Sequence, residues 1–372
     1  MSRFVPPPYP YDRLDRYRPV AEAHEGGVVD LSIGTPFDPP PDAVIAALAG
    51  SGSERAYPPS VGTVELRRAA SDWMQRTLGV SVPIESIGAS IGSKEFVASL
   101  PQWMRLRDPE RDTVLYPSIS YPSYEMGAVL AGCRAVPVPA RPDGTLDLGA
   151  IAPDDAARSL LLWVNSPSNP SGALDDLGAA AAWGRRHGVP VFSDECYVEF
   201  TWDGPGRTIL EHGPDGVVAV HSLSKRSNLA GVRVGFYAGD AELVDYLQLV
   251  RKHAGLMVPG PAQAAAAAAL GDAGHVEVQR ERYRRRLALM AEVLSAWRGA
   301  EVPLPAGGFY LWVPVDDGWA FTERLARDGG ALVSPGEFYG RGGEHHVRVA
   351  VVQPDERIEL VAERLRRAAA TR

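Results

Sequence analysis

The stretch VVAVHSLSK, residues 217–225, joins a run of apolar residues to a short polar segment that ends in a lysine. Four consecutive apolar residues, Val217–Val220, are typical of a strand that is buried on both faces, as in a parallel sheet. Ser222, Ser224 and Lys225 follow this strand, so they are expected at its carboxyl end, where parallel sheets bind their ligands. The stretch therefore predicts an α/β fold with a polar site at the carboxyl ends of the strands of its sheet.

Further apolar runs flank this stretch on both sides and alternate with helical patterns. Tyr124–Leu130 and Gly178–His187 are amphipathic or alanine-rich segments of this helical kind. Alternation of strands and helices is typical of an α/β domain with a mostly parallel central sheet. The buried strands are predicted at Thr113–Leu115, Ala135–Val138, Leu160–Val164, Val189–Phe192, Val217–Val220 and Val234–Ala238.

The pattern changes after Lys252, where Pro259 and Pro261 interrupt the chain. The segments that follow alternate differently and predict a smaller α+β domain. They are helices from about Ala262 and over Val276–Trp297, a strand over Gly307–Val313, a helix over Trp319–Asp328, a strand over Val347–Val352 and a helix from Asp355. We expect an N-terminal arm that is part of the small domain (1–35), a large domain (36–255) and a small C-terminal domain (256–372).

The composition excludes several classes of protein. Hydrophobic residues make up 45% of the 372 residues and charged residues 23%, which is the balance of an ordinary globular protein. A formal net charge of -8 disfavours a nucleic-acid partner. The apolar runs are too short to span a membrane, and the histidines lack the spacing of metal ligands. Cys133 and Cys196 are isolated, which disfavours a disulfide framework or a zinc site and favours a cytoplasmic location.

Lysine is scarce, and this narrows the search for a reactive amine. Only Lys94, Lys225 and Lys252 occur, and arginine cannot form a Schiff base with an aldehyde. Lys225 follows a buried strand beside Ser222 and Ser224. A surface lysine in a loop is the simpler interpretation of Lys225 alone. Arg233, which begins the next strand and can bind a phosphate with two hydrogen bonds, favours the functional one.

Other polar residues also follow predicted strands. Asp194 comes directly after a buried run, and its carboxylate could hold a proton on a pyridine nitrogen. Tyr197 and Asn169 could donate hydrogen bonds to a ring oxygen. Taken singly, Asp194 could be a helix cap and Asn169 part of an ordinary turn. Together they supply what pyridoxal 5′-phosphate (PLP) needs from a protein, with Lys225, Asp194 and Tyr197 as the catalytic residues.

Ser93 and Lys94 open a helical segment whose first backbone N–H groups could bind the cofactor phosphate. Tyr121 could stack on the cofactor ring, although a tyrosine of the core is an equally simple interpretation. A competing pattern lies just before this segment. The residues GASIG, 88–92, match the turn of serine hydrolases with Ser90 as nucleophile, and Asp194 and His221 follow in the hydrolase order. That pattern is short and common, so we rank a hydrolase, and a non-catalytic binding protein, below a PLP enzyme.

The motifs resemble those of class I/II, fold-type I aminotransferases, and the likeness to succinyldiaminopimelate transaminase of the lysine pathway is the closest. It covers nearly the whole chain and includes the segments around Gly34, Lys94, Lys252 and Gly336. The motifs that carry it are Asn169-Pro170 with Gly172, Ser193-Asp194-Glu195-Cys196-Tyr197, Ser222-Leu223-Ser224-Lys225 and Gly231-Val232-Arg233-Val234-Gly235.

The resemblance implies a homodimer with shared active sites and a reaction between N-succinyl-diaminopimelate and 2-oxoglutarate, with glutamate as the matching amino acid. In such a dimer Tyr57 would reach the cofactor phosphate of the partner. Arg348 would bind the substrate α-carboxylate, and Gly34 and Asn169 would also contact the substrate. Val232 stands where the lysine-pathway enzymes are expected to have an aromatic residue. A PLP enzyme of specialised metabolism, acting on another amino acid by transamination or by β/γ-elimination or replacement, therefore remains open.

Overall fold

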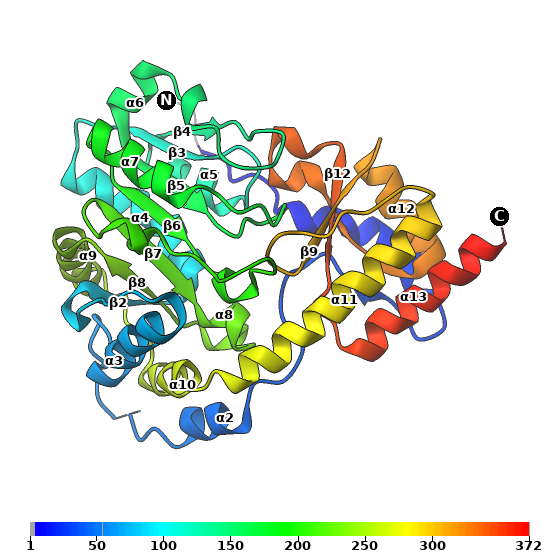
Figure 1. The fold of residues 1–372 in the computed structure, drawn as a ribbon, viewed down its shortest axis with the longest axis horizontal. Helices are drawn as coiled ribbons and strands as arrows, with labels where there is room; N and C mark the ends of the chain where they lie inside the picture. The colour runs from blue at the N-terminus through cyan, green and yellow to red at the C-terminus, as the bar shows by residue number, and fades with distance from the viewer. Residues whose placement is uncertain (1–3, 54, 372) are drawn as a thin grey trace. The chain divides into compact units, whose positions relative to one another are not determined.

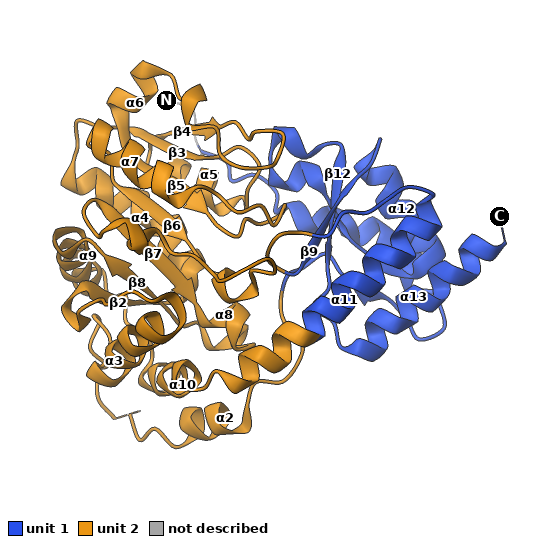
Figure 2. Cartoon of the chain, in the orientation of Figure 1, with its two compact units in different colours: residues 1–34, 282–304, 309–372 blue, residues 35–281, 305–308 orange. Residues whose placement is uncertain are grey.

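In a computed structural model that describes residues 4–53 and 55–371, the chain divides into two compact units (Figure 2). Unit 1 contains the chain up to Gly34, residues 282–304 and the chain from Phe309 onward, and unit 2 contains residues 35–281 and 305–308. Residues 256–281, which the sequence pattern assigned to the small domain, belong to unit 2. The first three residues of the predicted arm lie outside the described residues.

Unit 2 contains a seven-stranded sheet (Figure 1). In spatial order the strands are β2 (Ile87–Ser90), β8 (Gly235–Gly239), β7 (Val217–Ser222), β6 (Val191–Asp194), β5 (Ser159–Asn165), β3 (Thr113–Pro117) and β4 (Arg134–Val138). Strand β8 is antiparallel to both neighbours, and all other pairs from β7 to β4 are parallel. The expected mostly parallel sheet is confirmed. Because β8 alone runs in the opposite direction, its first residue lies at the same edge as the last residues of β2, β5, β6 and β7.

Helices cover both faces of this sheet (Figure 1), which explains why the strands read as continuous apolar runs. In β5, Leu162 and Val164 pack in one core cluster with α3 (Val64–Trp73), α7 (Leu177–His187) and α10 (Gly260–Gly271). Leu161 and Trp163 alternate with them and pack in a second cluster with α4 (Gly92–Arg107), α5 (Ser123–Leu130) and α9 (Ala241–His253). The alternation follows from the two-residue period of a strand.

Side-chain caps define the beginning of several helices in unit 2. Thr63, Asp176 and Asp240 accept hydrogen bonds from backbone N–H groups of the first turns of α3, α7 and α9. Helix α11 (Gly274–Arg298) begins in unit 2 and continues in unit 1. The remaining elements of unit 2 are α2 (Asp42–Ala49), η2 (Met74–Leu78), η3 (Ile84–Ser86), η4 (Leu148–Ala150), α6 (Pro153–Arg158), η5 (Val198–Phe200), η6 (Ile209–His212), α8 (Leu223–Arg226) and η7 (Ala230–Val232).

Unit 1 contains an antiparallel sheet with the order β11 (Ser334–Pro335), β12 (His346–Ala350), β9 (Tyr310–Pro314). The N-terminal arm packs within this unit, because β1 (Val29–Asp30) pairs with β10 (Ala331–Leu332). Its other elements are η1 (Pro10–Tyr17), α1 (Arg18–Glu22), α12 (Gly318–Gly329), η8 (Gly336–Tyr339), η9 (Arg341–Gly343) and α13 (Asp355–Ala370). Within the described part of the chain, none of the helices is long and apolar enough to cross a membrane.

Candidate active site

Polar residues end three neighbouring parallel strands at one edge of the large sheet. Asn165 ends β5 and lies opposite Asp194, which ends β6, and Ser222 ends β7. The side-chain amide of Asn165 donates to the backbone oxygen of Asp194 at 2.9 Å, and its oxygen accepts from the backbone N–H of Asn169 at 2.8 Å. These two hydrogen bonds fix the turn that carries Asn169 to the edge where Asp194 lies.

The carboxylate of Asp194 is buried and hydrogen-bonded. It accepts from the hydroxyl of Tyr124 at 2.8 Å and from the backbone N–H of Cys196 at 3.2 Å. Burial raises the pKa of Asp194, while these hydrogen bonds and the positive charge of Lys225 act in the opposite direction. Lys225 therefore lies close enough to Asp194 to stabilise its charged form. A buried carboxylate of this kind favours a cationic partner.

Lys225 belongs to α8, the short helix that follows β7. The hydroxyl oxygen of Ser222 caps this helix by accepting from the backbone N–H of Ser224 at 3.2 Å. The surroundings of Cys196 show which elements meet here. Burial and the neighbouring Asp194 raise the pKa of the Cys196 thiol, and a hydrogen bond with Ser93 and the charge of Lys225 oppose that shift. Ser93, at the start of α4, and Lys225 thus approach the same residue from different elements.

Arg233 and Gly92 form a close contact at the beginning of α4. The Arg233 guanidinium donates to the backbone oxygens of Ala230 at 2.8 Å and of Ile91 at 3.4 Å. A Cβ atom on Gly92 would lie 2.5 Å from Nη2 of Arg233, and Gly92 has a φ of +72°. Only glycine fits this position without displacing the guanidinium. The cation therefore lies beside the first backbone N–H groups of a 16-residue helix, an arrangement that suits an anion.

Tyr121 contacts Lys94, which belongs to the first turn of α4. The Lys94 amine lies 3.4 Å from the Tyr121 hydroxyl and 5.3 Å from the ring centroid. Tyr197 is buried at the start of η5, directly after β6. Ten predicted residues lie at the ends of the strands, in the segments next to them or in the first turn of α4. They are Ser93, Lys94, Tyr121, Asn169, Asp194, Tyr197, Ser222, Ser224, Lys225 and Arg233.

The other predicted site residues belong to other segments of the chain. Tyr57, in unit 2, is 92% exposed. Gly34 and Arg348 belong to unit 1. The guanidinium of Arg348 donates to the backbone oxygen of Ser32 at 2.5 Å and stacks between the rings of Tyr310 and Tyr339. A Cβ atom on Gly34 would lie 1.9 Å from the hydroxyl oxygen of Tyr310, so Gly34 allows this tyrosine to contact Arg348.

The hydrolase interpretation gains no support from the geometry. Within residues 4–53 and 55–371 the buried hydroxyl of Ser90 has no hydrogen-bond partner. Asp194 is bonded to Tyr124, and His221 lies 3.6 Å from the carboxylate of Glu195. The three residues that follow the hydrolase order therefore have separate surroundings.

The sequence pattern did not identify Glu195 and His221 as a buried pair. Burial raises the pKa of Glu195 to about 8 and lowers the pKa of His221 to about 3. Both groups are therefore neutral at pH 7, and their contact is not an ion pair. They line a cavity together with Trp73, Ser222 and Arg226. Only the position of Glu195, beside Asp194 at the end of a strand, could have indicated this pair from the sequence. Tyr124 and Asn165 were missed as partners of Asp194 because residues from three elements meet there.

The residues at this edge match the chemical groups of PLP. Lys225 carries an amine of the kind that binds an aldehyde, and Asp194 carries a buried carboxylate of the kind that pairs with a cationic ring nitrogen. The Gly92–Arg233 contact at the start of α4 supplies cationic and N–H donors for a phosphate. The geometry thus fits the cofactor that the sequence motifs predicted.

Comparisons with known proteins agree. The family described as aminotransferase class I and II matches residues 26–365. The chain is 42% identical to the 4-dedimethylamino-4-oxo-anhydrotetracycline transaminase OxyQ of Streptomyces rimosus, covering 96% of this chain and 99% of that enzyme. It is 34% identical to the LL-diaminopimelate aminotransferase of Desulforudis audaxviator, over 97% of this chain and 95% of the relative.

A solved structure extends the likeness to the fold. The probable N-succinyldiaminopimelate aminotransferase of Thermus thermophilus superimposes with a TM-score of 0.85 at 31% identity, covering 96% of this chain and 99% of that structure. The predicted fold type I and the predicted cofactor are both confirmed by the family. The chain belongs to the class I and II aminotransferases and is a PLP-dependent enzyme of fold type I.

Proposed function

We propose that this aminotransferase holds PLP at Lys225 and transfers an amino group between glutamate and a second compound. This second compound is an amine on one side of the reaction and the corresponding oxo compound on the other. The observation that carries the assignment is the convergence of Lys225, Asp194 and the Gly92–Arg233 contact at one sheet edge. The three kinds of group that the cofactor needs are thus supplied by residues of different elements. A surface lysine would not lie near a buried carboxylate of this kind.

The residues at this edge are assigned roles according to their chemistry. Lys225 would bind the aldehyde and Asp194 the ring nitrogen. Tyr197 and Asn169 would donate to the ring oxygen, and Tyr121 would stack on the ring. The phosphate would be bound by Ser93, Lys94, Ser222, Ser224 and Arg233, with Tyr57 of a second subunit.

Bound PLP supplies an electron sink for the electron pair released at the substrate α-carbon. The protein's own groups prepare this step. Asp194 keeps the ring nitrogen protonated because its negative charge favours a neighbouring cation. The Lys225 amine, held at the start of α8, can move a proton at the α-carbon. Arg348 is suited to bind the α-carboxylate, because a guanidinium offers two parallel N–H donors.

N-Succinyl-diaminopimelate is the first candidate for the amino substrate. The motif likeness favours it, and a structural neighbour at 31% identity is named as a probable N-succinyldiaminopimelate aminotransferase. The second candidate is the oxo compound in the name of OxyQ, 4-dedimethylamino-4-oxo-anhydrotetracycline. It is favoured by the higher identity of 42% over 99% of that enzyme and by Val232, the departure from the aromatic residue expected in lysine-pathway enzymes.

One assay separates the candidates. The purified enzyme with PLP is mixed with 2-oxoglutarate and N-succinyl-LL-diaminopimelate, and glutamate formation is followed. A parallel reaction contains glutamate and the OxyQ substrate, and 2-oxoglutarate formation is followed. Turnover in the first reaction supports the lysine-pathway assignment. Turnover only in the second assigns the enzyme to specialised metabolism, and release of a β- or γ-substituent without amino transfer would contradict both.

The same proposal includes a cytoplasmic homodimer with shared active sites. The exposed ring of Tyr57 supports it, because a residue that acts in a partner's site must lie on the surface of its own subunit. Class I and II family membership supports it as well.

A further inference from the structure

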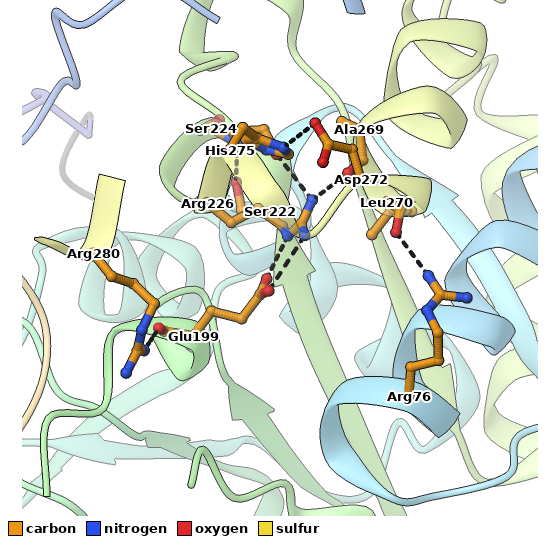
Figure 3. Close-up of polar contacts among 11 residues, drawn as sticks. Arg76, Glu199, Ser222, Ser224, Arg226, Ala269, Leu270, Asp272, His275 and Arg280 are labelled. Atoms are coloured by element: carbon orange, nitrogen blue, oxygen red, sulfur yellow. Dashed lines mark hydrogen bonds and ion pairs between the residues drawn. The ribbon is translucent and has the colours of Figure 1, made fainter. Parts of the chain in front are cut away.

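Arg226, the residue after Lys225, is buried and holds the short helix α8 in place (Figure 3). Its guanidinium pairs with the carboxylate of Glu199 through Nε and Nη2 and donates through Nη1 to the backbone oxygen of Ala269 at 2.8 Å. Nη1 also donates to the hydroxyl oxygen of Ser227 at 2.9 Å. A helix of four residues is not stable by itself, so contacts of this kind determine its conformation.

Ser227 continues the chain of contacts toward the surface through His275 and Asp272. The Ser227 hydroxyl oxygen lies 2.9 Å from Nε2 of His275. Nδ1 of His275 lies 3.0 Å from the Asp272 carboxylate (Figure 3). Arginine can only donate and an ionised aspartate can only accept. With neutral His275 this gives one direction: Arg226 donates to Ser227, Ser227 to His275, and His275 to Asp272.

The lowered pKa of His275 favours the neutral form that this direction requires. Burial lowers the pKa of His275, and so does the positive charge of Arg226, whereas Asp272 and Glu199 act in the opposite direction. A neutral imidazole with its proton on Nδ1 presents a free lone pair on Nε2 to the Ser227 hydroxyl. A second proton would place two positive groups on either side of one serine.

The same three side chains form the order of a Ser-His-Asp triad, but nucleophilic catalysis does not fit them. Ser227 is 1% exposed, so a substrate cannot reach it. Its oxygen also accepts from Arg226, which makes it a poorer nucleophile. The arrangement is therefore suited to orient Arg226.

We propose that His275 is a positioning residue for the cofactor lysine, acting through Ser227 and Arg226 to fix the turn that presents Lys225. The proposal rests on the assignment of Lys225 made above. It predicts that a polar chain ending at Asp272 controls how rigidly that turn is held.

The test compares four substitutions in the full-length enzyme. His275→Leu removes both hydrogen bonds, and Ser227→Ala removes the middle of the chain while leaving His275 in place. His275→Gln keeps one acceptor and one donor and should rescue. Arg76→Ala is the matched control, because Arg76 donates to Leu270 in the last turn of α10, at 3.0 Å, outside the chain of contacts (Figure 3).

The test uses two measurements, amide hydrogen exchange and the dissociation constant for PLP, and neither of them depends on enzyme activity. Amide hydrogen exchange of residues 223–229, measured without added PLP, should accelerate in His275→Leu and Ser227→Ala and match the wild type in His275→Gln and Arg76→Ala. The dissociation constant for PLP should rise at least about tenfold in the first two, as for the loss of a hydrogen bond to a charged group.

Unchanged exchange and unchanged PLP affinity in both His275→Leu and Ser227→Ala would overturn the proposal. Equal effects in Arg76→Ala would overturn it too, since they would show a general loosening of this end of α10. A failure of the Lys225 assignment is recognised separately. In that case borohydride reduction would attach PLP to another lysine, whereas the exchange result does not involve the cofactor.

Discussion

At the scale of single residues, Asp194 combines a proposed function with an unfavourable location. Its carboxylate is buried, and burial alone would favour the protonated form. The hydroxyl of Tyr124, the N–H of Cys196 and the charge of Lys225 oppose this. These interactions favour the ionised carboxylate, which is the form that can pair with a cationic ring nitrogen.

Replacing Asp194 tests this role. Asp194→Asn should retain PLP but lose activity by roughly 10²-fold or more, because the ring nitrogen is then poorly protonated. PLP content from absorbance and kcat from the amino-transfer assay separate the two effects. Asp176→Asn, at the exposed cap of α7, is the matched control and should keep full activity. Near-wild-type turnover of Asp194→Asn would show that Asp194 is structural.

Glu195 allows a prediction about stability and pH. Its pKa is about 8 in the folded protein and about 4.5 when unfolded, so rising pH in this window favours the unfolded state. The stability of Glu195→Gln relative to wild type should therefore increase between pH 5 and 8, by at most about 1.4 kcal/mol per pH unit. His221, with its lowered pKa of about 3, acts in the opposite sense in both proteins. Urea unfolding at several pH values measures this, and a pH-independent difference would contradict it.

At this scale the sequence singles out candidate residues with distinctive chemistry. Lys225 was identified because only three lysines exist and one follows a buried strand. Partners drawn from distant segments, such as Glu199 for Arg226 and His275 for Ser227, could not be predicted. Their contacts depend on where α8, η5 and α11 meet, and a sequence pattern does not specify this.

At the scale of elements, the strands were the best predicted. Strands β3, β5, β6, β7 and β8 are buried over all or nearly all of their length, so each reads as an apolar run. The expected buried strand at Ala135–Val138 is wrong in its burial, because β4 lies at the edge of the sheet and only Val138 is buried there. Strand β2 was not among the predicted strands. In the structure the short helix η3 takes Ile84–Ser86, and β2 begins cleanly at Ile87. Helix α8 has four residues and no periodicity to recognise.

The start of α4 gives a prediction at the same scale. Gly92→Ala adds a Cβ atom 2.5 Å from Arg233 at a φ of +72°, so the guanidinium must move and PLP affinity should fall at least about tenfold. Gly132→Ala is the control, since Gly132 has a φ of +68° and nothing lies within 4 Å of its Cβ position. Both substitutions place an alanine at a similar positive φ and so introduce a similar backbone strain, but only Gly92→Ala displaces Arg233. Equal PLP dissociation constants for the two variants would refute the proposed phosphate contact.

At the scale of the whole molecule, the domain boundary expected after residue 255 differs from the boundary between the two compact units, which follows Glu281. Helix α10 belongs to unit 2 because its alanines are buried in the same core cluster as the large sheet. Close packing of small side chains specifies no particular neighbour, so a run of alanines does not reveal which sheet it covers. Helix α11 is continuous across the boundary, which removes any loop signal.

The dimer is the prediction that belongs to this scale. Sedimentation at assay concentration should give a dimer, and Tyr57 should act in the partner's site. Tyr57→Ala and Lys225→Ala subunits, each of low activity, should regain activity when mixed and allowed to exchange, because one mixed site contains both native residues. An active monomer, or mixtures that stay inactive although subunits exchange, would contradict the shared site.

The most direct test of the central claim is borohydride reduction of the enzyme with bound PLP, followed by peptide mapping. The three lysines of the chain lie in separate segments, so the labelled peptide identifies the residue without ambiguity. We predict that the label is found on the peptide containing Lys225 and that Lys225→Ala is not labelled. Recovery of the label on Lys94 or Lys252 would contradict the account of the site.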